Sequence, residues 1–214
     1  MLSSAQTVAL MQGLTWTDGL SLISFVGGGL LGFVVSLARI APSRTLRGVV
    51  GAYVQVVQGT PVLILMFLLY FGLSLGGLDV PPLLAAGVAM IIYASAYLGE
   101  MWRACLQAVP RTQWEAAECM ALSRTQRMLH VVLPQAVRIA TPITVGFMVQ
   151  IVKSTSLASV IGLGEMTYIG KLINSTNFQP FVTYTITAAL YFCLCFPLSW
   201  ASRRLERRLH VPHR

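Results

Sequence analysis

Apolar positions along the chain fall into five long runs separated by short polar segments. A helix needs about 20 apolar residues to cross about 30 Å of hydrocarbon, and each run reaches or nearly reaches that length. The pattern therefore predicts an all-α integral membrane protein with five transmembrane helices. The runs cover residues 19–40, about 60–77, about 82–101, 141–162 and 181–200.

The stretch 45–58 precedes the second run and is less apolar, so we expect it to lie along the membrane interface. At the start of that run, Thr60 is predicted as the N-cap and Pro61 as the first helical residue. In the first run, Gly28 and Gly32 form a Gly-x-x-x-Gly pair, which allows helices to approach closely. Such a pair suits packing within one subunit as well as a contact between two subunits.

The composition agrees with a membrane protein. The chain has 214 residues, of which 56% are hydrophobic and 10% charged, whereas soluble domains carry about 25% charged residues. A net charge of +8 would suggest a nucleic-acid partner if the protein were soluble. Here the basic residues lie in separate clusters beside apolar runs, so they indicate topology. We expect contact with membrane lipid and none with nucleic acid.

The distribution of charge predicts the orientation of the chain. Thirteen of the 15 basic residues lie in the segments that follow the first, third and fifth runs, namely Arg39, Arg44, Arg47, Arg103, Arg111, Arg124, Arg127, Arg138, Arg203, Arg204, Arg207, Arg208 and Arg214. The opposite loops hold only Asp18, Asp79, Glu165 and Lys171 as charged residues. Cytoplasmic loops are enriched in positive charge. Residues 1–18 are therefore expected to form a periplasmic N-terminal segment, 19–202 a single transmembrane domain, and 203–214 a basic cytoplasmic tail.

The longest polar connection covers about residues 103–139 and begins with a helix-start signal. Thr112, followed three positions later by Glu115, has the spacing of a capping box, which predicts a short helix in this segment. The helix would present a small, smooth apolar face, formed by Ala116, Ala117 and Met120.

A second short helix is predicted in the same connection. Ser123 and Gln126 form another capping box, and Pro134 is expected to end the helix that starts there. The two helices are expected to join near Leu122. An isolated loop has little use for such order, so the segment is predicted to meet a partner.

The segment EAAECMALSRTQRMLHVVLP resembles the EAA loop in the membrane subunits of bacterial ABC importers. The pattern of that loop is EAA, three residues, Gly, nine residues, and Ile-x-Leu-Pro. Its positions are matched here by Glu115, Ala116, Ala117, Leu133 and Pro134, with Val131 in place of Ile and Ala121 in place of Gly. Three further stretches, QGTPVLILMFLLYFGL, SAYLGEMWRACLQAVPRTQWEAA and IVKSTSLASVIGLGEM, are similar to the polar amino acid (type I) branch. That branch usually has Arg at Gln58, Gly at Thr112 and Asp at Ser154.

The resemblance implies a type I importer permease fold in the bacterial inner membrane, with no enzymatic activity of its own. It implies two ABC ATPase subunits that bind ATP and Mg²⁺, a second permease subunit (a copy or a paralogue), and a periplasmic amino-acid-binding protein. The chain itself would hold no cofactor. In this family a helix of the loop docks in a groove of the ATPase. The residues expected to couple the two subunits are Glu115, Ala116, Ala117, Met120, Ala121, Leu133 and Pro134.

Lys153 is the main candidate for the transport path, because it lies within the fourth apolar run. A charge at that depth costs about 2.5–3.5 kcal/mol on insertion scales. It either faces the bundle interior or a water-filled cavity, or it snorkels or forms a structural ion pair. Nearby polar residues that could line the same path are Gln58, Thr60, Ser154, Thr155 and Ser156; the last three could equally bond carbonyls of the preceding turn.

Two other functions fit an apolar chain of this size. A secondary carrier driven by ions tends to hold carboxylates within its spans and to contain internal repeats, and neither is evident. An intramembrane enzyme needs convergent His, Asp or Ser groups, and the four cysteines and three histidines show no metal-ligand spacing. The chain has no phosphate-binding loop of the Walker type, so it is not expected to hydrolyse ATP itself.

Overall fold

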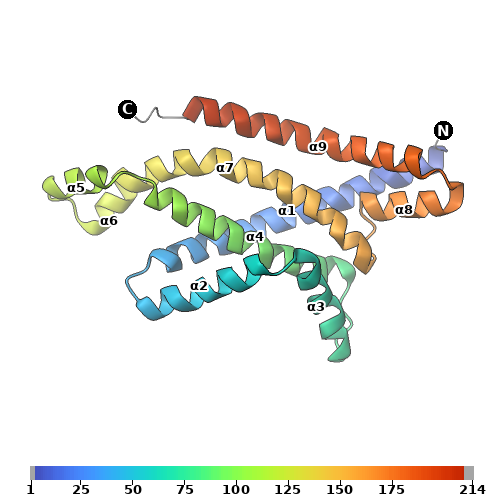
Figure 1. The fold of residues 1–214 in the computed structure, drawn as a ribbon, viewed down its shortest axis with the longest axis horizontal. Helices are drawn as coiled ribbons and strands as arrows, with labels where there is room; N and C mark the ends of the chain where they lie inside the picture. Colours follow the sequence, from blue (N-terminus) through green and yellow to red (C-terminus); the bar gives the residue numbers. More distant parts are fainter. Residues whose placement is uncertain (1–2, 210–214) are drawn as a thin grey trace.

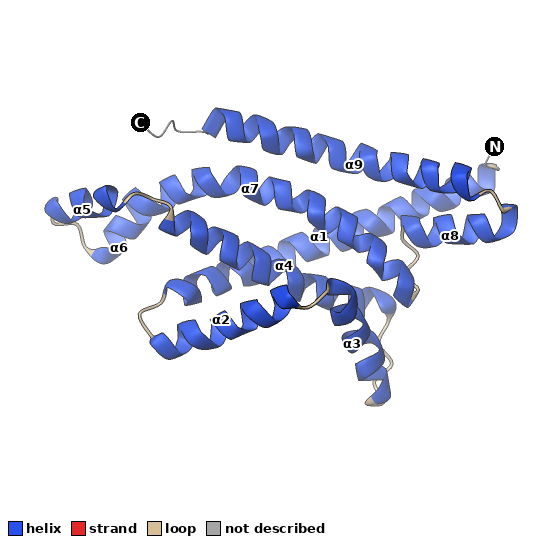
Figure 2. Ribbon diagram, in the orientation of Figure 1, coloured by secondary structure: helices blue, strands red, loops and turns tan. Residues whose placement is uncertain are grey.

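Helices joined by short turns make up almost all of residues 3–209, the part of the chain that the computed structural model describes (Figure 2). No strand occurs within this range, so the all-α prediction is confirmed. The elements are α1 (Ser4–Ile40), α2 (Arg44–Gly59), α3 (Val62–Leu75), α4 (Pro82–Gln107), α5 (Arg111–Cys119), α6 (Arg124–Gln126), the π-helix η1 (Arg127–Val132), α7 (Leu133–Ser154), the 3₁₀ helix η2 (Thr155–Ile161), α8 (Met166–Asn177) and α9 (Pro180–Leu209).

The long helices α1, α4, α7 and α9 run roughly along the longest axis of the molecule (Figure 1). The helices α1, α4 and α9 and the continuous segment Arg124–Ile161 are each long and apolar enough to cross a membrane, and the bent pair α2–α3 makes a fifth span if its two helices cross together. The α1–α2 turn, α5, α6 and the end of α9 gather at one end of the molecule (Figure 1). The start of α1 and helix α8 lie at the other end.

Helix α1 begins well before the predicted boundary at residue 19. Ser3 is its N-cap: the Ser3 hydroxyl accepts from the Gln6 N–H at 3.3 Å, and the Gln6 side chain accepts from the Ser3 N–H at 2.9 Å. Residues 4–18 are therefore helical and continuous with the first apolar run. The capping signal lies in a less apolar stretch, so hydropathy alone starts the helix too late.

The second span differs from its prediction because the helix breaks at a proline. Pro61 is the N-cap of α3, and Thr60 is the C-cap of α2 instead of the predicted N-cap. A residue before proline avoids the helical region, and Thr60 has ψ 129°. Helices α2 and α3 meet at 98°. The 14 residues of α3 reach only about 21 Å, which is too short for a span by itself.

Helix α2 packs against α1 and α4, whereas its sequence was expected to lie along the membrane interface. The Tyr53 hydroxyl donates to the carbonyl of Ile92 at 3.1 Å and lies 2.6 Å from the hydroxyl of Ser95. Its buried residues Gly51, Val54 and Val57 are spaced three residues apart, which places them on one face. This face of α2 therefore packs on protein within the subunit.

Helix α8 was not predicted. Its N-cap is Glu165, whose carboxylate accepts from the backbone N–H groups of Thr167 and Tyr168 at 3.0 and 2.8 Å. Its buried residues are Met166, Gly170 and Ile173, an i, i+4, i+7 pattern. That pattern was available in the sequence, but the segment is short and its mean hydropathy is low.

The tightest helix contact joins α1 and α4, and it depends on the absence of a side chain at Gly28. A Cβ atom added there would lie 2.3 Å from the Cβ of Ala94, and one added at Gly32 would lie 3.0 Å from the Cβ of Leu98. The Gly-x-x-x-Gly pair therefore packs within the subunit. Ala94 and Leu98 are completely buried at this contact.

We expect Gly28→Ala to lower the stability of the folded subunit by about 1–3 kcal/mol, because the added methyl group must push α1 away from α4. Thermal unfolding in detergent measures the effect. Gly29→Ala is the matched control, because the nearest atom to its new Cβ is 3.9 Å away. Equal unfolding temperatures for the two variants would contradict the close contact.

Candidate functional site

Helix α5 lies beyond the ends of α4 and α7, beside α6 (Figure 1). It begins at Pro110, which is the N-cap with φ −55° and ψ 139° and makes no side-chain capping bond. The predicted capping box of Thr112 and Glu115 is therefore wrong: the helix starts earlier, and both residues lie inside it. Proline fixes the entry geometry without a capping hydroxyl.

The end of α5 is closed by a Schellman turn. The Leu122 N–H donates to the carbonyl of Ala117 at 3.3 Å, and the Ala121 N–H donates to the carbonyl of Glu118 at 2.9 Å. Ala121 adopts φ 56°, the left-handed region that normally favours glycine. The resemblance expects Gly at position 121, and the backbone there has the conformation that suits Gly. Alanine adopts this left-handed conformation with backbone strain.

One face of α5 is fixed to the rest of the subunit. Ala117 is 3% exposed. Trp114 packs against a buried apolar cluster, which we call the seat cluster, formed by Leu106, Val109, Val132 and Ala136. An ion pair of 2.8 Å between Arg127 and Glu118 also ties α5 to η1. Helix α5 is therefore held in one orientation by packing and by charge.

The opposite face of α5 is exposed. Four of its residues, spaced three or four positions apart, share this face: Thr112, Glu115, Ala116 and Cys119. Met120 lies next to it at the C-cap and is 74% exposed. The predicted smooth face of Ala116, Ala117 and Met120 is therefore corrected, because Ala117 points into the subunit. Among residues 3–209, no side-chain hydrogen bond or ion pair involves Glu115.

The second half of the connection is continuous with α7. The capping box of Ser123 and Gln126 is confirmed, with both of its hydrogen bonds present. Pro134 does not end this helix, as predicted, but lies at the start of α7, directly after the π-helix η1. The Leu133 N–H donates to the carbonyl of Met128, five residues back. The wider turn accommodates the proline ring, which would collide with a carbonyl in a regular helix.

The remaining predicted coupling residues have separate positions. Leu133 packs against the seat cluster, so it supports α5 from beneath. Pro134 is exposed, as is Ala121. Only Glu115, Ala116 and Met120 of the predicted set therefore share the outer side of α5.

Lys153 is exposed near the end of α7, where it faces a groove of about 640 Å³ between α7 and α9. Arg203 lies along the same groove. Within the described residues Lys153 has no ion-pair partner, so the structural ion pair that the sequence left open as an alternative is not formed there. The groove also contains Tyr191 and Ser199, which makes it partly polar.

The residues after Lys153 turn inward. Ser154 is 6% exposed and Thr155 is completely buried. The hydroxyl of Thr155 donates to the carbonyl of Val152, and that of Ser156 donates to the carbonyl of Lys153, both at 2.7 Å. The bonding to the preceding turn that the sequence allowed is therefore confirmed for these two residues.

Gln58 and Thr60 lie at the bend between α2 and α3. The Gln58 amide donates to the carbonyl of Ala96 at 3.4 Å, and the Thr60 hydroxyl donates to that of Val56 at 2.7 Å. Both side chains therefore satisfy nearby backbone groups. No hydrogen bond in the described part of the chain joins either of them to Lys153.

Three charged side chains, Arg39, Glu100 and Arg103, form a cluster that we call the clamp. Glu100 and Arg103, three residues apart on α4, form an ion pair, and Arg39 joins it, with its Nε 3.3 Å from the Glu100 carboxylate. Arg39 also donates to the carbonyl of Arg47. The clamp ties α1, α2 and α4 together near α5, and it could not be read from sequence because Arg39 and Glu100 are far apart in the chain.

Glu165 was predicted in a loop but is completely buried. Besides the two N–H groups of α8, it accepts from the Tyr191 hydroxyl at 2.5 Å. Burial raises the pKa of the Glu165 carboxyl. The Glu165 carboxylate joins the start of α8 to α9 and therefore stabilises the fold at that end of the molecule.

In the part of the chain described here, no three His, Cys, Asp or Glu side chains are grouped to hold a metal.

Residues 20–211 match the model of a protein family described as the binding-protein-dependent transport system inner membrane component. The chain belongs to this family. Similar proteins from Bacillus subtilis (strain 168) include a probable glutamine ABC transporter permease protein, GlnM, 35% identical over 93% of this chain and 92% of its own length. An L-cystine transport system permease protein, TcyB, is 33% identical over 94% of this chain and 86% of its own.

The fold of this family member is also found in solved structures. A chain from the crystal structure of an amino acid ABC transporter with histidines superimposes with a TM-score of 0.90 at 31% identity, covering 94% of both chains. A chain of the MetNI methionine ABC transporter in an inward-facing conformation gives a TM-score of 0.80 at 23% identity, covering 98% of this chain and 100% of its own, which supports the fold alone.

Family membership decides between the functions that the sequence allowed. The chain is a permease subunit of an ATP-driven ABC importer, a multi-pass protein of the bacterial inner membrane. It works with an ATPase and with a substrate-binding protein, and ATP hydrolysis occurs on the separate ATPase. The prediction of an importer permease is confirmed, and the secondary carrier is not supported.

In this permease, Ala121→Gly should stabilise the turn after α5 by about 0.5–1 kcal/mol, because glycine relieves left-handed strain that exceeds its entropic cost. Hydrogen exchange of the Ala121 and Leu122 amides, whose bonds close the turn, measures the effect as slower exchange. Ala116→Gly is the control: at this regular helical position glycine should speed exchange. Faster exchange in Ala121→Gly would contradict the strained turn.

Proposed function

We propose that this permease carries an amino acid or a related compound, delivered by a periplasmic binding protein, through a pathway formed with a second copy of the chain or with a paralogue. The names of similar proteins, which include glutamine, cystine and arginine permeases, support this substrate class. A bundle of five spans is too small to enclose such a pathway, which supports a second permease subunit. Lys153 and its groove would face that pathway.

Two ATPase subunits, which bind ATP and Mg²⁺, would dock on the exposed face of α5, one on each permease. The observation that carries this proposal is the asymmetry of α5. One face is fixed by Trp114, Ala117 and the Glu118–Arg127 ion pair, whereas the face of Glu115 and Ala116 has no partner within the described residues. A short helix fixed on one side transmits a push from its other side without tilting, which suits helix-in-groove docking.

The orientation of the chain follows from the same assignment. The end that holds α5 also holds the turn after α1, with Arg44 and Arg47, and the end of α9 (Figure 1). Clustered positive charge supports a cytoplasmic location for this end. The N-terminal end of α1 and helix α8 would then lie on the periplasmic side, with the C-terminus in the cytoplasm.

The docking proposal predicts that Ala116→Arg abolishes co-purification of the ATPase and ATP-dependent uptake. The new side chain adds bulk and charge to the exposed face, and it removes no contact inside the subunit. Ala5→Arg, at an exposed helical alanine at the opposite end of the molecule, should leave both unchanged. Uptake and ATPase binding at the parental level in Ala116→Arg would show that this face is not the docking surface.

Glu115→Gln gives a finer test of the same surface. Glu115 caps no helix and pairs with no described side chain, so loss of its charge should leave the subunit intact. If the carboxylate meets a basic residue of the ATPase, the contact loses about 1.5–3 kcal/mol. The affinity for the ATPase, measured by titration in detergent, should fall accordingly, with unchanged thermal unfolding of the permease.

The pathway proposal predicts that Lys153→Met reduces uptake at least several-fold while the ATPase stays bound. The substitution removes the exposed ammonium group, which would otherwise face the substrate or a negative charge in the pathway. Lys171→Met is the control: Lys171 is the only other lysine, is also exposed, and lies on α8. Uptake in membrane vesicles at the parental rate in Lys153→Met would exclude this residue from the pathway.

A further inference from the structure

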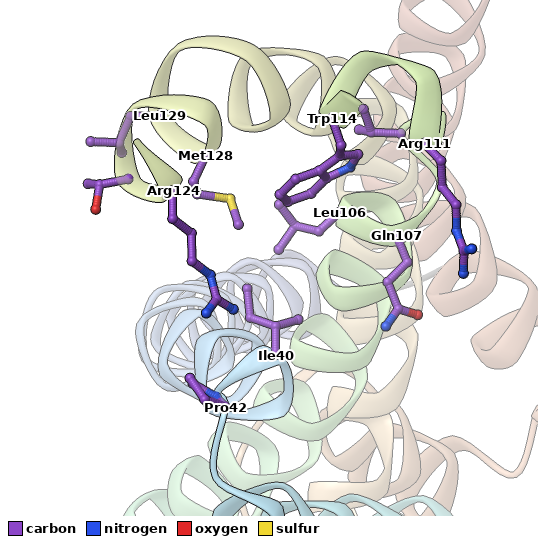
Figure 3. Close-up of a pocket in the computed structure, with 11 residues that line it drawn as sticks. Ile40, Pro42, Leu106, Gln107, Arg111, Trp114, Arg124, Met128 and Leu129 are labelled. Carbon is purple, nitrogen blue, oxygen red and sulfur yellow. The ribbon is translucent and has the colours of Figure 1, made fainter. Parts of the chain in front are cut away.

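A groove of about 1000 Å³ lies beneath α5, on the side of the helix that carries Arg111 and Trp114 (Figure 3). Its walls come from five elements: the end of α1, the end of α4, α5, α6 and η1. The apolar residues that form its floor are Ile40, Leu106, Trp114 and Met128. The indole of Trp114 lies over Leu106 (Figure 3). The groove is therefore an apolar surface between the ends of membrane-spanning helices.

Two guanidinium groups stand at the rim of this groove. Arg124 extends past Met128 toward Ile40, and Arg111 lies on the other side of Trp114, beside Gln107 (Figure 3). Both arginines are exposed, and neither forms an ion pair within residues 3–209. No Asp or Glu in the described part of the chain lines the groove. A ligand here would meet positive charge outside and apolar side chains inside.

We propose that this groove binds an anionic phospholipid, with an acyl chain against the apolar floor and the anionic head group at the rim, where Arg111 and Arg124 supply positive charge. Three features favour this ligand. The groove lies at the ends of α1 and α4, two helices long and apolar enough to span a membrane, so lipid would reach it from the adjacent leaflet. Basic pockets between the ends of membrane helices suit anionic head groups. The apolar floor gives a free phosphate ion no added contact, whereas an acyl chain gains by covering it.

The site is independent of the surface proposed for the ATPase. A bound lipid would contact α5 through Trp114 and Arg111, on its inner side, and leave the outer face free. It would also contact α6 through Arg124 and η1 through Met128. The lipid would therefore fill the space beneath α5 and stabilise its attachment to α4 and η1, whatever substrate the importer carries.

Tryptophan fluorescence can report on the groove directly, because Trp114 lies in it. The full-length chain, freed of lipid in a non-ionic detergent, is titrated with phosphatidylglycerol whose acyl chains carry bromine, a contact quencher. The same titration uses brominated phosphatidylcholine as the zwitterionic comparison. Because the chain has four tryptophans, Trp114→Phe measured in parallel isolates the quenching at Trp114.

We expect phosphatidylglycerol to quench Trp114 at a concentration at least about tenfold lower than phosphatidylcholine does. Each arginine near an anionic head group contributes about fivefold in affinity. Arg111→Gln with Arg124→Gln should therefore remove the preference. Arg207→Gln with Arg208→Gln, which removes the same charge from the exposed end of α9, should keep it. Circular dichroism checks that both double variants are folded.

Three results would overturn the proposal. Equal quenching by the two lipids, or an unchanged preference in the Arg111 and Arg124 double variant, would show that the groove does not select an anionic lipid. Displacement of the lipid by millimolar inorganic phosphate or glycerol phosphate would identify a simple anion site. Loss of quenching when the purified ATPase is added would make the groove part of the subunit interface.

Discussion

The close approach of α1 to α4 is the constraint on which the rest of the arrangement depends. At Gly28 the two helices are so close that even a single added Cβ atom would collide with the Cβ of Ala94. In a membrane the apolar lipid gives little reason for helices to associate, so contacts between backbones and small side chains hold them together. The clamp of Arg39, Glu100 and Arg103 fixes the same pair where charges can be hydrated. Packing holds α1 to α4 along most of their contact, and electrostatics holds their ends.

The end of α4 then becomes the base on which α5 is built. Leu106 and Val109 extend the packing of α4 into the seat cluster, and Trp114 covers that cluster from above. Charged side chains surround it: Glu118 and Arg127 form an ion pair, and Arg124 lies beside the groove without an ion-pair partner among residues 3–209. The helix that we propose as the docking site for the ATPase is therefore positioned by residues on its inner side, which pack next to the end of α4.

The sequence predicted the membrane helices, the second capping box and the importer loop, because these depend on local patterns. It misplaced features that depend on tertiary context. Ala117 has the same side chain as Ala116, and only the position of Trp114 decides which alanine is buried. Pro134 reads as a helix stop unless a π-turn precedes it, and π-turns have no clear sequence signal. Glu165 reads as a loop charge because its partner Tyr191 lies 26 residues away.

The segment from Arg124 to Ile161 is one continuous, curved helical rod of 38 residues without an intervening loop (Figure 1). At about 1.5 Å per residue it is about 55 Å long. A tilt of about 5° about its α6 end would displace the other end by about 5 Å, the height of one helical turn. The π-helix lies close to that pivot, and Ser154 and Thr155 lie near the far end of the rod. A small rotation of this segment near Trp114 would thus move its far end, beside Ser154 and Thr155, by about the length of an amino-acid side chain.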